Sequence, residues 1–88
     1  MKEKTVIVPN ETGLHARPSS QLVEEANEYE AEIKFIGAGE RVNAKSLMSV
    51  MALVINQGEQ ITIQAKGEDA KAAVDSLAAI IEDGFGEM

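Results

Sequence analysis

The sequence predicts an α+β fold, an open-faced β-sandwich in which three helices cover one face of a four-stranded, mainly antiparallel sheet. Short segments in which apolar and polar residues alternate indicate strands with one buried and one wet face. Segments in which apolar residues recur at steps of three and four indicate amphipathic helices. With 88 residues, 44% of them hydrophobic, the chain is long enough for one thin core, so residues 1–88 are expected to form a single domain.

The expected order of elements is β-α-β-β-α-β-α, and its first half is a strand, a helix and a hairpin. Residues 4–8 are rich in β-branched side chains, which favours a strand, and PNETG then breaks the pattern. Alternation returns at residues 32–35, and GAG at 37–39 turns the chain into a short strand at 40–43. The helix between them is expected from Ala16, because these side chains follow helical spacing: Ser19, Leu22, Val23, Ala26 and Tyr29.

The second half is expected to contain an apolar segment, a strand and a long helix. Residues 46–55 are almost continuously apolar, a pattern that fits a short helix, a core helix or a buried strand. Residues 60–65 alternate and predict the fourth strand. The last helix is expected after Gly67, with Glu68 and Asp69 in its first turn and Gly84 as its stop.

Composition excludes several classes of protein. The chain has no cysteine and one histidine, so disulfides and thiolate ligands are excluded, and neither a metal site nor a cofactor is expected. A net charge of -7 argues against a nucleic-acid partner. No apolar run approaches the ~20 residues of a membrane span, and the first residues are too charged for a signal peptide. A cytoplasmic protein without membrane insertion is therefore expected.

Charge is distributed unevenly along the chain. Residues 12–23 contain Arg17 and no acid, and residues 41–58 contain Arg41 and Lys45 and no acid. One interpretation is that apolar helices simply lack charges. The other is a surface suited to an anion or to an acidic partner.

His15 and Arg17 predict a site for phosphoryl groups. His15 falls at the N-cap position of the first helix, and Pro18 suits the first turn because its missing N–H costs nothing there. Free N–H groups of that turn, together with the Arg17 guanidinium, would hold phosphate oxygens. A neutral imidazole nitrogen is nucleophilic, and phosphoryl transfer requires mainly positioning and charge stabilisation. No carboxylate is expected nearby, so hydrolysis is not expected. The alternative is that His15 merely caps a helix.

Two motifs resemble those of one family. GLHARPSS at 13–20 is similar to the active-centre motif of HPr, the histidine-containing phosphocarrier of the bacterial sugar phosphotransferase system. VNAKSLMSVMALVINQGEQITI at 42–63 resembles the second motif of that family. The resemblance implies that His15 accepts a phosphoryl group from enzyme I and passes it to enzyme IIA domains of sugar permeases. It implies Arg17 as electrostatic partner, Ser20 as a partner-binding residue, and a relay protein rather than an independent catalyst.

The second motif implies a regulatory serine and a docking helix. Ser46 matches the serine that a dedicated HPr kinase/phosphorylase phosphorylates in Gram-positive HPr proteins. In that family, the serine-phosphorylated protein acts with a catabolite regulator protein. Leu47, Met48 and Met51 would bind partners. A helix here would carry two apolar faces, of which only one is expected to be buried. One face would hold Leu47, Val50 and Val54, and the other Met48, Met51 and Ile55.

Several residues depart from the family pattern, and two alternative functions follow from the resemblance. Ser19 stands where alanine is more common, Ser49 and Val54 where glycine is common, and Ala52 where serine is common. One alternative is a purely regulatory HPr-like binding protein that acts through Ser46 and residues 47–55. The other is a carrier for a specialised nitrogen-related or fructose-related branch. A regulatory paralogue lacks the histidine, so the presence of His15 argues against the first alternative.

Overall fold

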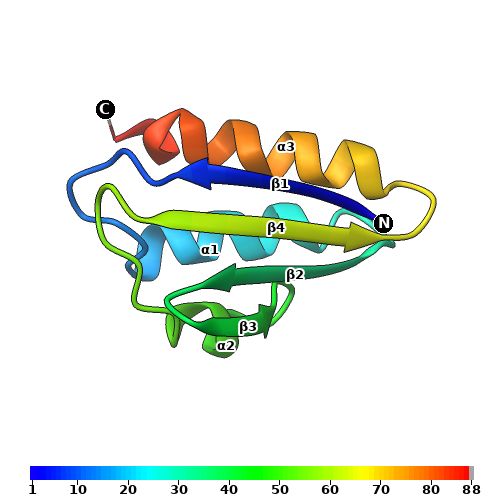
Figure 1. Cartoon of the computed structure of the whole chain (residues 1–88), viewed down its shortest axis with the longest axis horizontal. Coiled ribbons are helices and arrows are strands. Elements are labelled where there is room, and N and C mark those ends of the chain that lie inside the picture. The colour runs from blue at the N-terminus through cyan, green and yellow to red at the C-terminus, as the bar shows by residue number, and fades with distance from the viewer. Residues whose placement is uncertain (88) are drawn as a thin grey trace.

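The computed structural model describes residues 1–87, which form a four-stranded sheet and three α-helices (Figure 1). The predicted fold class and the order β-α-β-β-α-β-α are confirmed. None of the helices within these residues is long and apolar enough to cross a lipid bilayer. In chain order the elements are β1 (Lys2–Ile7), α1 (Ala16–Ala26), β2 (Glu32–Gly37), β3 (Glu40–Asn43), α2 (Leu47–Met51), β4 (Gln60–Lys66) and α3 (Ala70–Glu82), followed by a 3₁₀ turn (Gly84–Gly86).

The sheet has the strand order β1-β4-β2-β3, and every neighbouring pair of strands is antiparallel. In β2 the side chains of Ile33 and Phe35 are buried, and in β4 those of Ile61 and Ile63 are buried. The residues between them point to the opposite face, because successive side chains of a strand alternate. The prediction of one covered and one wet face is confirmed.

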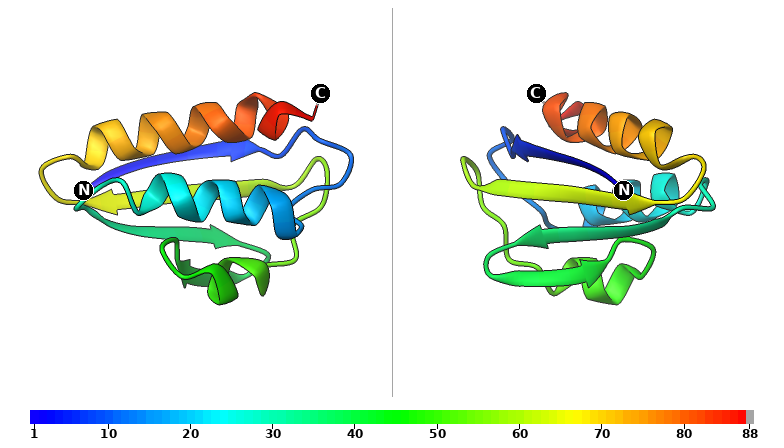
Figure 2. Two further views of the ribbon diagram at one scale, coloured as in Figure 1. Left: turned by 180° about the vertical axis from the view of Figure 1, so that it is seen from behind. Right: turned by 45° about the vertical axis from the view of Figure 1, so that its right-hand side comes forward.

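All three helices cover the same face of the sheet. Figure 2 (left) shows α1 and α3 in front of the strands in the view from behind, with α2 beside the β3 edge. Leu22 of α1 and Leu77 of α3 are fully buried in one cluster with Phe35. Burying a side chain of this size contributes about 1.5–3 kcal/mol relative to exposure. The apolar stripe of each long helix therefore fixes its position on the sheet.

The apolar segment at 46–55 is only partly helical. α2 ends at Met51, and residues 53–55 belong to no helix or strand. Leu53 and Ile55 are buried whereas Val54 is exposed, which is the alternation of an extended chain. Ile55 packs against Gly37, where an added Cβ would lie 2.6 Å from Ile55 Cδ1. The extended stretch thus fills the space beside β2 that a longer helix would leave open.

The two acids expected in the first turn of the last helix precede it instead. α3 begins at Ala70, so Asp69 is its N-cap residue, and the Asp69 side chain makes no cap hydrogen bond. The two oxygens of this carboxylate accept hydrogen bonds from the backbone N–H groups of Glu30 and Ala31, each at 2.8 Å. The N–H of Glu30 is the main cause that lowers the pKa of Asp69 below its usual value. Asp69 therefore ties the connection between α1 and β2 to the start of α3.

Gly84 follows the end of α3 with a φ of 69°, as expected for a helix stop. The chain then folds back toward the start of α1. Phe85 is buried, and its carbonyl oxygen accepts a hydrogen bond from Gln21 Nε2 at 3.3 Å. The segment after α3 is thus held against α1.

The loop before α1 touches the segment after α2 through the backbone. Leu14 N–H donates to the carbonyl oxygen of Ile55 at 2.9 Å. Gly13 has a φ of 63°, and a Cβ added there would lie 2.3 Å from that same oxygen. This approach is too close for any residue with a side chain, so the loop requires glycine.

Gly13→Ala is expected to destabilise the fold far more than Gly39→Ala, which serves as the matched control. Both glycines have a positive φ, but nothing lies within 4 Å of a Cβ added at Gly39. Gly39→Ala should lower the free energy of unfolding by about 1 kcal/mol, the cost of the left-handed conformation, and Gly13→Ala by about 3 kcal/mol or more, because the loop must also move. Urea denaturation of both variants measures the difference, and equal losses would contradict the contact.

Candidate functional site

His15 lies at the N-cap position of α1, as predicted, with backbone angles of an extended residue. Its side chain makes no capping hydrogen bond and is 43% exposed. The N–H groups of a first helical turn have no partner within the helix, and Pro18 has no N–H. The first N–H of α1 that bonds within the chain is that of Ser19, which donates to the His15 carbonyl oxygen at 3.0 Å. Unpaired amides therefore lie directly after the imidazole.

A carboxylate contacts the imidazole, contrary to the prediction. Glu87 Oε2 lies 3.2 Å from His15 Nε2. Its other oxygen, Oε1, accepts hydrogen bonds from Thr12 Oγ1 at 2.7 Å and from Asn10 Nδ2 at 3.0 Å. The expectation that acids stay away from His15 held for the neighbouring sequence and was wrong in space. Seventy-two positions separate the two residues.

The hydrogen bonds that hold Glu87 also set its charge. The Thr12 hydroxyl, followed by the Asn10 amide, lowers the pKa of the Glu87 carboxyl below its usual value, and the contact with His15 acts in the same direction. Glu87 is therefore a carboxylate at neutral pH. The only sequence signal for its position is the GFGE ending, in which a large apolar residue follows a helix stop.

The contact with Glu87 determines which imidazole nitrogen is free. A carboxylate can only accept hydrogen bonds, so Nε2 must carry the hydrogen in this contact. In the neutral ring, Nδ1 then holds the unshared electron pair. Nδ1 makes no hydrogen bond to any group of residues 1–87. The nucleophilic nitrogen is thus the one on the far side of the ring from Glu87.

Arg17 and Ser20 lie on the first turns of the same helix as His15. Arg17 is exposed, and its guanidinium forms neither a hydrogen bond nor an ion pair with the part of the chain that the structure describes. Ser20 is half-buried. Residues three apart share one side of a helix, so Arg17 and Ser20 face the same way. Within residues 1–87, neither side chain forms a hydrogen bond or ion pair with the His15 ring.

Ser19 and Asn10 carry buried polar atoms close to this site. Ser19 is fully buried in α1, and its Oγ has no hydrogen-bond partner among residues 1–87. The same holds for Asn10 Oδ1, although the Asn10 amide nitrogen donates to Glu87, Thr12 and the Gly13 carbonyl. Sequence reasoning found Ser19 as a departure from the family pattern, and it did not identify Asn10.

Ser46 is the N-cap residue of α2. The N–H of Ser49 donates to Ser46 Oγ at 3.4 Å, so Ser46 and Ser49 take part in one cap. Ser46 itself is half-buried. α2 packs against α1, which brings this serine to the same side of the sheet as His15 (Figure 2).

The exposed apolar side chains around α2 come from both predicted faces. Met48 is 85% exposed, and Leu47 and Met51 are also exposed. Ile55, assigned to the face of Met48, is buried, whereas Val54 is exposed. The assignment failed because it assumed one helix through residue 55. We call Leu47, Met48, Met51 and Val54 the apolar patch.

Comparison with known proteins gives one consistent result. A family model described as PTS HPr component phosphorylation site matches residues 2–83. An HPr-like protein Crh of Halalkalibacterium halodurans is 45% identical over 82 residues, which are 93% of this chain and 98% of that protein. A phosphocarrier protein HPr of Mycoplasma pneumoniae is 39% identical over 93% of this chain and 94% of its own length.

Longer relatives and solved structures also show similarity to HPr proteins. The chain spans 17% of a multiphosphoryl transfer protein of Haemophilus influenzae, with 44% identity over 86 residues. The crystal structure of an HPr from Thermoanaerobacter tengcongensis superposes with a TM-score of 0.94 at 40% identity, covering 100% of this chain and 99% of that one. The match extends over the motif that contains His15 and the motif that contains Ser46. The chain therefore belongs to the HPr family, the phosphocarrier proteins of the phosphotransferase system.

Proposed function

We propose that this chain accepts a phosphoryl group on His15 from enzyme I, which takes it from phosphoenolpyruvate, and delivers it to enzyme IIA domains of sugar permeases in the cytoplasm. The observation that carries the proposal is the hydrogen bond between His15 and Glu87. It holds the ring by Nε2 and leaves the Nδ1 electron pair unengaged at the accessible end of α1. A reactive nitrogen that is accessible and positioned is what a phosphoryl acceptor requires.

The transfer step follows from this arrangement. The Nδ1 electron pair forms a bond to phosphorus while the bond from phosphorus to the donor atom breaks, and the released electron pair stays with the donor. The imidazole keeps its hydrogen on Nε2, so the ring becomes cationic when Nδ1 is phosphorylated. The Glu87 carboxylate, 3.2 Å from Nε2, stabilises that cation. Delivery to the acceptor reverses these bond changes.

The phosphoryl oxygens would be held by groups that have no partner within residues 1–87. These are the first-turn N–H groups of α1 and the Arg17 guanidinium, which is free to turn toward them. Donors placed where negative charge develops lower the barrier to transfer.

Glu87 does not make this site a hydrolase in our proposal. Its two oxygens are occupied by His15, Thr12 and Asn10, and it approaches the ring from the Nε2 side. Water attacking a phosphoryl group on Nδ1 would come from the other side, beyond reach of the carboxylate. The phosphorylated carrier would therefore keep its group until a partner docks.

The apolar patch supports the proposal that enzyme I and enzyme IIA dock on one surface. Flexible methionine side chains adapt to different partners, and exposed apolar patches mark sites of protein association. Three of the four patch residues lie on α2, which packs against α1, the helix with His15 at its N-cap position. Ser20, on the exposed turn of α1, would border the same surface.

A regulatory role for Ser46 is part of the proposal. An HPr kinase/phosphorylase would phosphorylate Ser46, and the product would act with a catabolite regulator protein. The similarity to an HPr-like Crh protein supports this role, and a purely regulatory protein is the second candidate function. The exposed His15 ring, held through Nε2, supports a phosphocarrier as the first candidate function. Another alternative is that the chain carries phosphoryl groups in the same way, but for a specialised nitrogen-related or fructose-related branch of the phosphotransferase system.

Transfer to His15 is tested with the unmodified chain, enzyme I and phosphoenolpyruvate. The chain has one histidine, so any acid-labile phosphoryl group on histidine must be on His15. Mass spectrometry should show one added group on the wild type and none on His15→Ala. Arg17→Ala should still accept it, about 10²-fold more slowly in single-turnover kinetics. Circular dichroism of each variant is the control for folding, and full labelling of His15→Ala would remove the assignment.

Titration of Glu87 tests the hydrogen bonds that its carboxylate accepts from the loop before α1. By ¹³C NMR, Glu87 should titrate below the usual glutamate pKa, and Thr12→Val should raise that pKa, because the Thr12 hydroxyl is the largest cause of the shift. Thr5→Val is the matched control, since Thr5 bonds Thr62 and not Glu87. A depressed carboxyl pKa stabilises the folded state above the unfolded-state pKa, and this contribution is lost as the pH falls through the folded-state pKa.

The stability difference between wild type and Glu87→Gln should therefore be largest at neutral pH and vanish in acid. A difference that does not change with pH would show that the carboxylate charge has no part in the contact.

Ser46→Asp should slow phosphorylation of His15 by enzyme I about tenfold at low salt, because it places a negative charge beside the apolar patch where the partner docks. Raising the salt concentration should restore part of the rate by screening. Ala72→Asp is the matched control, because it adds the same charge on the exposed side of α3, away from α2. Equal rates for wild type and Ser46→Asp at low salt would exclude regulation through charge.

A further inference from the structure

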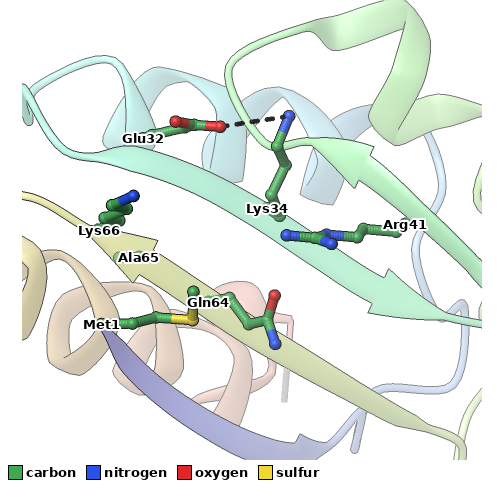
Figure 3. Close-up of a pocket in the computed structure, with 7 residues that line it drawn as sticks. All are labelled: Met1, Glu32, Lys34, Arg41, Gln64, Ala65 and Lys66. Carbon is green, nitrogen blue, oxygen red and sulfur yellow. Dashed lines mark ion pairs between the residues drawn. The ribbon is translucent and has the colours of Figure 1, made fainter.

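The open face of the sheet carries a group of cations that the phosphocarrier function does not use. In an acidic chain of net charge -7, Lys34, Arg41 and Lys66 all project from the face that no helix covers. They surround a hollow of about 170 Å³ on the outer side of β2, β3 and β4 (Figure 3). The site at His15 lies on the other side of the sheet, at the start of α1.

Strand register brings these side chains together. Lys34 of β2 lies directly opposite Gln64 of β4, and Lys66 lies directly opposite Glu32. Arg41 of β3 is two residues from the position opposite Lys34, so it is its diagonal neighbour. Side chains at such positions on one face are roughly 5–8 Å apart, which one small ligand can span. Figure 3 shows the Arg41 guanidinium extending across β2 toward Lys34 and Gln64.

The cations are poorly neutralised by the protein itself. Within residues 1–87, neither Arg41 nor Lys66 has a carboxylate oxygen within 4.0 Å. Lys34 has one weak ion pair, with Glu32 at 3.8 Å. The other carboxylate on this face, that of Glu3, accepts a hydrogen bond from Gln64 Nε2 at 2.6 Å. The hollow therefore keeps a surplus of positive charge.

Gln64 adds an acceptor at the same place. Its Oε1 is buried and has no hydrogen-bond partner in the described residues. The orientation of the amide is fixed, because Nε2 must face the Glu3 carboxylate. The free oxygen is turned toward Arg41 (Figure 3), and because it is buried, a ligand reaches it only after a side chain that covers it has moved. An unpaired buried acceptor is costly, and a ligand hydroxyl would satisfy it.

We propose that this hollow binds a small phosphate monoester that carries free hydroxyl groups. A doubly charged phosphate suits the guanidinium, which grips two of its oxygens, together with the two ammonium groups. A hydroxyl group next to the phosphate would donate to Gln64 Oε1. The volume of about 170 Å³ corresponds to about six water molecules, which suits a small ligand. This site is independent of phosphoryl transfer at His15.

The test uses the ¹⁵N-labelled full chain at low ionic strength and glycerol 3-phosphate as the probe. Amide resonances of β2, β3 and β4 around Lys34, Arg41 and Gln64 should shift and saturate, with a dissociation constant on the order of 1 mM. Glycerol should cause no shift, and sulfate should bind at least about tenfold more weakly because it lacks the hydroxyl.

Two variants and one control separate the parts of the site. Arg41→Gln should weaken glycerol 3-phosphate binding about tenfold. Gln64→Met should weaken glycerol 3-phosphate and leave sulfate unchanged. Lys71→Gln is the matched control, because Lys71 is an exposed lysine of α3 that pairs with Asp75.

Three outcomes would overturn the proposal. Shifts confined to residues 15–20 would place the phosphate at the start of α1 instead. Equal affinity for sulfate and glycerol 3-phosphate, unchanged by Gln64→Met, would mean general attraction of anions. An absence of saturable shifts would exclude the site altogether.

Discussion

The sheet can bury only one of its faces, and the rest of the architecture depends on that constraint. A single layer of helices covers residues such as Phe35 and Ile63, whose side chains all point the same way because strand side chains alternate. The polar residues between them are thereby fixed on an open face. The alternation of apolar and polar residues along the strands therefore determines where the core lies, which face the helices cover and which face is exposed to water.

The region around His15 is assembled from three segments that are distant in sequence. The loop before α1 is held by the backbone contact of Gly13 and Leu14 with Ile55, and the tail after α3 reaches the same loop through Glu87. Each segment supplies something different: the His15 ring, the support for its loop, and the carboxylate beside the ring. The arrangement explains how a small domain can hold an imidazole in one orientation.

Local patterns predicted most of the fold and the position of His15, and failed where distant segments meet. Alternation in β2 and β4, the N-cap position of His15 and the cap at Ser46 all follow from neighbouring residues, so the sequence is sufficient for them. Glu87 was missed because its contact with His15 depends on how the tail folds back after Gly84. The segment 53–55 was misread because an unbroken apolar run carries no period, and the backbone of Leu14 decides its conformation.

The position of the tail also limits how this domain can be joined to others. A segment attached after the last residue would follow closely on Glu87, whose side chain is in direct contact with the imidazole. A domain or affinity tag attached there would have to leave from the edge of the surface where partners are expected to approach. Attachment before β1 avoids this, because β1 begins at the opposite end of the sheet (Figure 1). Whether an added domain is fused before β1 or after the tail should therefore affect how partners reach the surface around His15.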